Sequence, residues 1–257
     1  MPEYSTILVS ADDRLGRISL NRPDKLNALS GELLNELIDA ARWFDSQPQV
    51  RVVIVSGEGR AFSAGADIAE SRDGDAAADQ RSDLGRRMAD AIEAMSAITI
   101  ARIHGHCVGG AVVLAAACDL RVAGEGTRFS IPEVDLGIPL AWGGIPRLVR
   151  EIGPALTKEL VLTCRPFDAR EAREAGFLNR VVPDDQLDAE VEALAASLLD
   201  KPGIPVRATK RHVDAITRGM IGIDHAWSDA HGLIAARADD ESRAAAERYL
   251  ERFRKRA

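Results

Sequence analysis

The order of hydrophobic and polar positions predicts strands and helices that alternate along most of the chain. The residues 50–55 are almost all β-branched, which is typical of a strand buried on both faces. The segments that predict strands are 7–9, 16–20, 50–55, 98–103, 119–123 and 127–130. Because helical patterns separate most of these segments up to about residue 182, the sequence predicts an α/β fold.

Helical spacing begins after residue 30, where Ser30 is a good N-cap and Glu32 suits the first turn. The apolar positions that follow at this spacing are Leu33, Leu34, Leu37, Ile38, Ala41 and Phe44. A polar stretch at 70–82, which we expect to be mobile, precedes a second helix at 83–96. From residue 145 the pattern is mostly helical, and the last 60 or so residues show helical patterns only. We therefore expect an α/β core over 1–198 and a helical region over 199–257.

Composition and charge narrow the class of protein. The 257 residues carry a net charge of −7, which argues against a general nucleic-acid binder because such proteins need clustered Lys and Arg. No apolar run reaches the roughly 18–20 residues of a membrane helix, and no signal peptide is visible. The cysteines Cys107, Cys118 and Cys164 have neither zinc nor disulfide spacing. These features predict a cytoplasmic protein that does not enter membranes.

Two loops place small residues just before a helix, at 63–66 and at 109–111. The first N–H groups of a helix have no partner within it, and small residues let a ligand come close to them. Two such groups aimed at one point would bind an oxyanion. The alternative interpretation is that both loops are tight turns without a ligand, and the pattern alone favours this second interpretation.

Glu133 is the best candidate for acid/base chemistry. It follows a proline among apolar residues, where burial would raise the pKa of a carboxyl group toward the working pH. Asp135 would share its face if the segment were extended. On residue type alone, a surface carboxylate or a helix cap is the commoner role for either.

Metal, nucleotide and thiol chemistry have little support. His104 and His106 flank Gly105 without further ligands at a suitable spacing, so we expect no metal site. Cys107 has no visible His partner. The pair Gly109-Gly110 lacks the Lys-Ser/Thr of a phosphate-binding loop, and no dinucleotide motif follows a strand.

The motifs taken together resemble the enoyl-CoA hydratase/isomerase (crotonase) family. The stretches that carry the resemblance, in order, are 21–29 (NRPDKLNAL), 61–67 (AFSAGAD), 104–111 (HGHCVGGA), 118–119 (CD), 132–137 (PEVDLG), 143–148, 172–176, 181–183 and 239–240. Each is weak alone, but the ordered set covers essentially the whole chain.

The resemblance implies a spiral of ββα turns whose C-terminal helices build a homotrimer, often a dimer of trimers. It implies an acyl-CoA thioester as substrate and no cofactor beyond the coenzyme A of that substrate. The backbone N–H groups of Ala64 and Gly110 match the family's oxyanion hole, and Glu133 matches a catalytic glutamate. The residues that match the coenzyme A site are Leu26, Ala28, Ala66, Asp67 and Ile68. Lys25, and Arg252 or Lys255 near the C-terminus, could contact the phosphates of coenzyme A. Trp142 is either a wall of the acyl pocket or part of the core.

One departure from the family pattern bears on the reaction. Hydratases of the family carry a second glutamate, and Val113 stands at its position. Valine cannot titrate or orient water, so Glu133 remains as the one matched acid. The dienoyl-CoA isomerases of the family carry two further acids, and Val113 and Ala141 stand at those positions. A single base suits the shift of a 3-enoyl-CoA to a 2-enoyl-CoA, which we expect as the activity.

Three alternatives stay open at the sequence level. An enoyl-CoA hydratase would need a substitute for the missing glutamate, with Asp135 as the first candidate. Decarboxylation of a malonyl-type thioester needs only enolate stabilisation. A protein that binds acyl-CoA without chemistry would keep the oxyanion hole, but it would not need Glu133.

Overall fold

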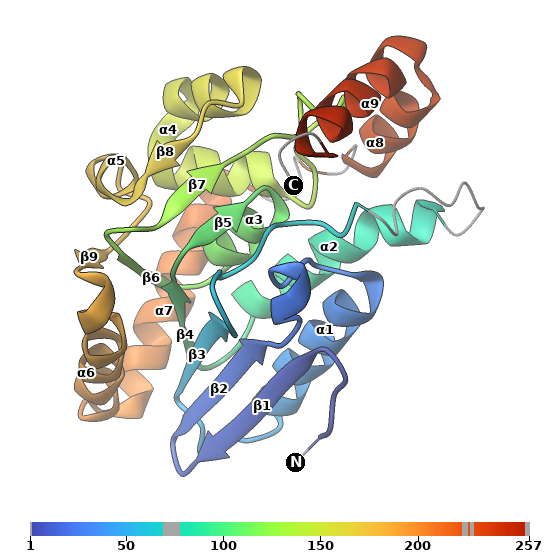
Figure 1. The fold of residues 1–257 in the computed structure, drawn as a ribbon. Helices are drawn as coiled ribbons and strands as arrows, with labels where there is room; N and C mark the ends of the chain where they lie inside the picture. The colour runs from blue at the N-terminus through green and yellow to red at the C-terminus, as the bar shows by residue number, and fades with distance from the viewer. Residues whose placement is uncertain (1, 69–77, 223–225, 227–228, 255–257) are drawn as a thin grey trace.

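The computed structural model describes every residue except 1, 69–77, 223–225, 227–228 and 255–257. Its main sheet has six strands in the order β1-β2-β3-β4-β6-β9 (Figure 1). The bounds are β1 Ile7–Asp12, β2 Leu15–Leu20, β3 Val52–Gly57, β4 Ile98–Ile103, β6 Leu120–Gly124 and β9 Arg180–Val182. β1 and β2 pair antiparallel, and the remaining neighbours pair parallel. The predicted α/β fold is confirmed.

A second, smaller sheet joins β5 (His106–Val108), β7 (Arg128–Ser130) and β8 (Phe167–Asp168). Of these, the hydrophobic pattern predicted only β7, and it also missed β9 of the main sheet. These strands have two or three residues each. A period of two cannot be recognised over so short a stretch, so only pairing with distant strands defines them.

The helix α1 (Gly31–Asp45) follows the sequence prediction closely. The Ser30 side chain caps it by accepting a hydrogen bond from the Leu33 N–H at 3.2 Å. All six apolar positions that define the helical spacing are buried. α2 (Ala78–Glu93) begins five residues before the expected start, so 78–82 belong to the helix. The rest of the stretch expected to be mobile, 70–77, lies outside the described residues.

The remaining helices are α3 Gly110–Ala117, α4 Gly144–Thr163, α5 Ala169–Glu174, α6 Leu187–Leu199, α7 Gly203–Met220, α8 Asp229–Ala238 and α9 Asp240–Arg254, with single 3₁₀ turns at Pro23–Lys25 and Asp184–Gln186. The expected end of the core at residue 198 lies in the last turn of α6. Beyond it, α8 turns back and packs against α2 (Figure 1). Trimer formation through this region stays a prediction.

The β-branched run of β3 explains how the sheet is buried. Val53 and Val55 face the larger core, which also contains α1, α2 and α3. Val52 and Ile54 face the opposite side, where they pack with Leu187 and other residues of α6. Because helices cover both faces, an unbroken apolar run is stable here, where a half-exposed strand would alternate with polar residues.

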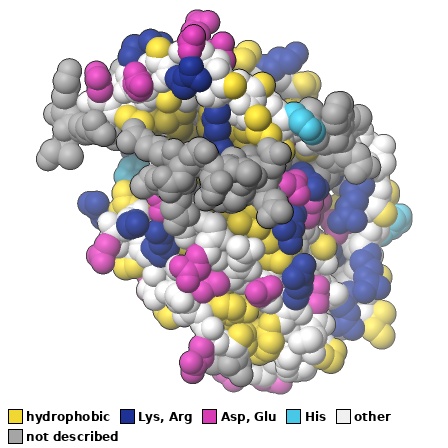
Figure 2. All heavy atoms as spheres, turned by 90° about the vertical axis from the view of Figure 1, so that its right-hand side faces the viewer, with side chains coloured by type: hydrophobic (Ala, Val, Ile, Leu, Met, Phe, Trp, Pro, Cys, Tyr) yellow, Lys and Arg dark blue, Asp and Glu magenta, His cyan; other side chains and the backbone are white. Residues whose placement is uncertain are grey.

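The surface carries charges of both signs. Figure 2 shows one face, on which Lys and Arg are interspersed with Asp and Glu. Among the described residues, no helix combines the length and hydrophobicity that a membrane span needs.

Candidate active site

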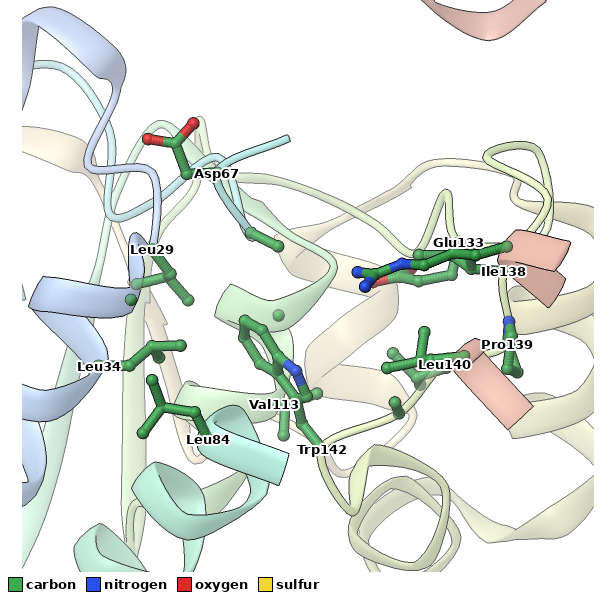
Figure 3. Close-up of a pocket in the computed structure, with 16 residues that line it drawn as sticks. Leu29, Leu34, Asp67, Leu84, Val113, Glu133, Ile138, Pro139, Leu140 and Trp142 are labelled. Carbon is green, nitrogen blue, oxygen red and sulfur yellow. The ribbon is translucent and has the colours of Figure 1, made fainter. Parts of the chain in front are cut away.

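One cavity brings the sequence motifs together. Its lining comes from the start of α1, the 66–67 loop, α2, the N-terminus of α3, the turn at Glu133, the segment 138–142 and α8 (Figure 3). Its volume is about 120 Å³. Most lining side chains are apolar; among the described ones, the ionisable groups are Asp67, Glu133 and Arg237.

Glu133 is the buried acid of this cavity. The residue is only 9% exposed, and its Oε2 has no hydrogen-bond partner among the described residues. Burial raises the pKa of Glu133 to about 7, and a hydrogen bond from its own backbone N–H offsets this only in part. The sequence-based expectation that burial raises this pKa is confirmed.

The backbone around Glu133 forms a turn and is not extended. The N–H groups of Leu136, Gly137 and Ile138 donate to the carbonyls of Pro132, Val134 and Glu133, at 2.9–3.0 Å. Asp135 is therefore not aligned with Glu133; it is exposed and does not line the cavity. The condition under which the two carboxylates would share a face is not met, because the segment forms a turn.

The Gly109-Gly110 pair lies directly against the acid. Gly109 has φ +52°, and a Cβ there would come within 2.4 Å of Glu133 Oε1, so only glycine fits. Gly110 is the first residue of α3 and lines the cavity. Its N–H has no hydrogen-bond partner among the described residues, as expected for the first turn of a helix.

The second loop differs from the sequence prediction at Ala64. Its N–H donates to the carbonyl of Leu26 at 2.8 Å, and the residue does not line the cavity. The Ala64 N–H is therefore engaged within the fold, and its assignment to an oxyanion hole is wrong. Ala66 does line the cavity, and its N–H meets no acceptor in the part of the chain that the structure describes.

Pairing with the segment before α1 explains why Ala66 is the available donor. Leu29 and Ala66 form a parallel β-bridge, in which the Leu29 N–H donates to Gly65 and the Leu29 carbonyl accepts from Asp67. In such a bridge the backbone groups of Ala66 point away from Leu29. Gly65 makes the turn at φ +85°. This pairing is long-range, so local spacing could not reveal which N–H it leaves free.

The residues expected to contact coenzyme A border the same loop. Asp67 is buried and pairs with Arg22 at 2.9 Å, a partner that sequence reasoning missed. Lys25 lies 3.9 Å from Asp67 and is 61% exposed. The half-buried residues Leu26, Ala28 and Ile68 flank this pair. Lys255 lies outside the described residues, as does the side chain of Arg252.

Val113 and Ala141 both line the cavity and are buried. The two positions at which relatives in the resembled family carry additional acids are thus apolar and line the same cavity as Glu133. Arg237, from α8, is the ionisable lining residue that the sequence did not suggest, because nothing in its local pattern links a C-terminal helix to this cavity.

His104 and Cys107, the candidates for a metal ligand and for a nucleophile, have surroundings typical of structural residues. The ring nitrogens of His104 lie 2.8 Å from Arg102 Nη1 and 2.9 Å from the Gly59 carbonyl, and burial lowers its pKa. Burial raises the pKa of Cys107 well above its usual range, as expected for an inert thiol. Among the described residues, no cluster of three His, Cys, Asp or Glu side chains could hold a metal ion.

The sequence also matches known proteins. Residues 11–256 match the family described as enoyl-CoA hydratase/isomerase. A "probable enoyl-CoA hydratase" of Mycobacterium tuberculosis is 40% identical over 215 residues, 82% of each chain. A "crotonyl-CoA hydratase" of Syntrophomonas wolfei is 37% identical over 244 residues, 93% of each chain.

Solved structures of enoyl-CoA hydratases have the same fold as this chain. An enoyl-CoA hydratase from Mycobacterium avium subsp. paratuberculosis superposes with a TM-score of 0.88 at 26% identity, covering 96% of this chain and 100% of the other. An enoyl-CoA hydratase/isomerase from Xanthobacter autotrophicus has a TM-score of 0.85 at 31% identity, covering 95% and 91%. The chain therefore belongs to the enoyl-CoA hydratase/isomerase (crotonase) family of acyl-CoA enzymes.

Proposed function

We propose that this protein shifts the double bond of a 3-enoyl-CoA to give a 2-enoyl-CoA, with Glu133 as the only base. The observation that carries the proposal is the cavity's set of acids. Glu133 has no cationic partner within hydrogen-bond reach among the described residues, Asp67 is engaged by Arg22, and Val113 replaces the second acid.

The proposed reaction moves one proton and no other atom. Glu133 takes a proton from C2, and the electron pair of that C–H bond becomes delocalised over C2, C3, C4 and the thioester as a dienolate. The N–H groups of Ala66 and Gly110 hold the thioester oxygen while its negative charge develops. The carboxyl group then returns the proton to C4, which leaves the double bond between C2 and C3.

The environment of Glu133 suits both steps. A pKa of about 7 keeps a useful fraction of the group ionised near neutral pH, and the protonated form that follows is a competent acid. An acid/base group matched to the working pH in this way typically contributes about 10²–10⁴ to the rate.

Coenzyme A is part of the substrate in this proposal, and no further cofactor is needed. Its backbone contacts would come from Leu26, Ala28 and Ile68, with the Lys25 ammonium near a phosphate. Assembly into homotrimers or dimers of trimers, as the family resemblance implies, belongs to the same proposal.

Hydration of a 2-enoyl-CoA is the second candidate, because the names of the relatives favour it. It requires a water held over C3 as well as a proton delivered to C2. Val113 can do neither, and the exposed side chain of Asp135 does not reach the cavity. Decarboxylation of a malonyl-type thioester and binding without chemistry are the remaining alternatives.

The test is product analysis in D₂O with trans-3-enoyl-CoA and trans-2-enoyl-CoA. We expect deuterium at C2 and C4 and interconversion of the two isomers, without 3-hydroxyacyl-CoA. In Val113→Glu, a second carboxylate should add hydration, while Val113→Gln, of similar size, should not. Rapid hydration by the wild type would overturn the isomerase proposal. Binding without exchange at C2 would also overturn it, in favour of decarboxylation or of binding without chemistry.

A further inference from the structure

Trp142 occupies a place in the cavity that its local sequence does not explain. Its indole lies in the middle of the cavity, with Leu34 and Leu84 on one side and Leu140 on the other (Figure 3). The ring therefore divides the apolar lining into a part near α1 and α2 and a part near Glu133.

Two glycines on different helices make room for this ring. A Cβ at Gly85 of α2 would come within 2.0 Å of the indole, and a Cβ at Gly110 of α3 within 2.2 Å. Both contacts are far below any real Cβ distance. The indole is thus inserted into a slot that exists only because neither helix carries a side chain there.

The backbone of Trp142 is also held in an unusual conformation. Its φ is +62°, a region that bulky residues rarely adopt and that persists only where surrounding contacts impose it. The buried Arg147 donates to the carbonyls of Trp142 and Gly143 at 3.2 and 3.3 Å. Asp229 of α8 accepts from the Gly143 N–H at 2.8 Å.

Arg147 is itself fixed, because it donates to Asp90 at 2.8 Å and to Glu93 at 2.6 Å, both on α2. Arg147 of α4, itself fixed by α2, and Asp229 of α8 therefore hold the backbone at Trp142 and Gly143. With its backbone held in this way and its indole seated against Gly85 and Gly110, the ring forms a wall of the cavity.

We propose that Trp142 determines specificity by ending the acyl pocket, so that the enzyme accepts short acyl groups and rejects long ones. This inference rests on the proposed acyl-CoA function. The cavity of about 120 Å³ supports it. Since an apolar cavity of about 150 Å³ holds one benzene molecule, a cavity of about 120 Å³ has room for a short acyl group and not for a long one.

The test measures binding alone, so it does not depend on which reaction the enzyme catalyses. Calorimetry would give the Kd of butanoyl-, hexanoyl-, octanoyl- and decanoyl-CoA, which are saturated and do not react. For the wild type we expect at least about a tenfold loss of affinity between hexanoyl- and decanoyl-CoA. In Trp142→Ala this loss should disappear, while butanoyl-CoA binding changes little; Trp142→Phe should behave in an intermediate way.

Two further variants test whether the limit on acyl length comes from the Trp142 ring itself. Trp43→Ala removes an indole from α1 outside the cavity and should leave the chain-length profile unchanged. Gly85→Ala should push the ring into the cavity and weaken hexanoyl-CoA binding by about tenfold. In the Trp142→Ala background the same Gly85→Ala change should have no effect.

Each other outcome contradicts the inference. A wild type that binds all four ligands equally has no length limit to explain. A length limit that survives Trp142→Ala, or an equal effect of Gly85→Ala in both backgrounds, places the limit elsewhere. If the wild type binds none of the ligands, the acyl-CoA function itself fails, and the inference fails with it.

Discussion

Two glutamates in this molecule, the buried Glu133 and the half-buried Glu93, have pKa values shifted in opposite directions. Burial alone would raise the pKa of Glu93, but Arg147 and Arg150 surround it and bring its pKa below the ordinary value. Glu133 has no hydrogen-bonded cation among the described residues, and burial raises its pKa to about 7. Burial therefore does not decide what a carboxylate does; the neighbouring charges do.

The comparison separates a structural ion pair from a reactive group. Glu93 holds together α2 and α4, and through Arg147 it supports the loop that carries Trp142. Glu133 lies against Gly109, and Gly110 of the same cavity has an N–H without an acceptor among the described residues. A cation bonded to Glu133 would lower its pKa and weaken it as a base at neutral pH.

The largest expected effect comes from replacing Glu133, the reactive one of the two glutamates. Glu133→Gln should reduce deuterium exchange at C2 by on the order of 10²–10⁴, because Gln cannot accept the proton. Acyl-CoA affinity should change far less, since the residue keeps its shape. Exchange measured by mass spectrometry in D₂O would check this, and exchange near the wild-type rate would exclude Glu133 as the base.

Replacing Glu93, the glutamate of the structural ion pairs, should lower the stability of the fold more than the catalytic rate. Glu93→Gln leaves the buried guanidinium of Arg147 short of a charge, and we expect a loss of about 3 kcal/mol in the free energy of unfolding. Urea denaturation would measure it. The control is Glu159→Gln, which weakens an exposed pair with Arg165 and should cost less than about 0.5 kcal/mol. Equal losses in the two variants would show that the Glu93 cluster is not special.

The raised pKa of Glu133 also predicts a pH dependence of stability. The folded protein holds this proton more tightly than the unfolded chain, so the contribution is present below pH 4.5 and is lost as the pH rises through about 7. The difference of about 2.5 pKa units corresponds to about 3 kcal/mol. Glu133→Gln should therefore gain stability over the wild type between pH 5 and pH 8, by up to that amount.

Urea denaturation of both proteins at pH 5 and pH 8 would check the sign. Parallel pH profiles for the two proteins would mean that the pKa of Glu133 is not raised. In the same pH range, kcat/KM of the wild type should rise with pH through about 7, because only the ionised carboxylate can accept the proton.

The smallest effect is expected at Asp135. This side chain is exposed and outside the cavity, so Asp135→Asn should change kcat/KM by less than about twofold. Steady-state kinetics would measure it. A loss comparable to that of Glu133→Gln would revive the two-carboxylate interpretation and contradict the arrangement of this turn.

Local sequence patterns were sufficient for the parts of this protein that depend on period, capping and burial. The spacing of apolar residues and the Ser30 cap predicted α1, and the β-branched run predicted β3 with both faces covered. The apolar neighbours of Glu133 predicted its burial and raised pKa. These features follow from neighbouring residues, which a sequence displays directly.

Only the tertiary structure decided which groups meet. The bridge between Leu29 and Ala66 leaves the N–H of Ala66, and not that of Ala64, without an acceptor among the described residues. The turn after Glu133 removes Asp135 from the site. Arg237 reaches the cavity from α8, and Trp142 fits a slot between two distant glycines. The sequence contains all of these residues, but their contacts join segments far apart in the chain, and no local period or spacing encodes such pairings.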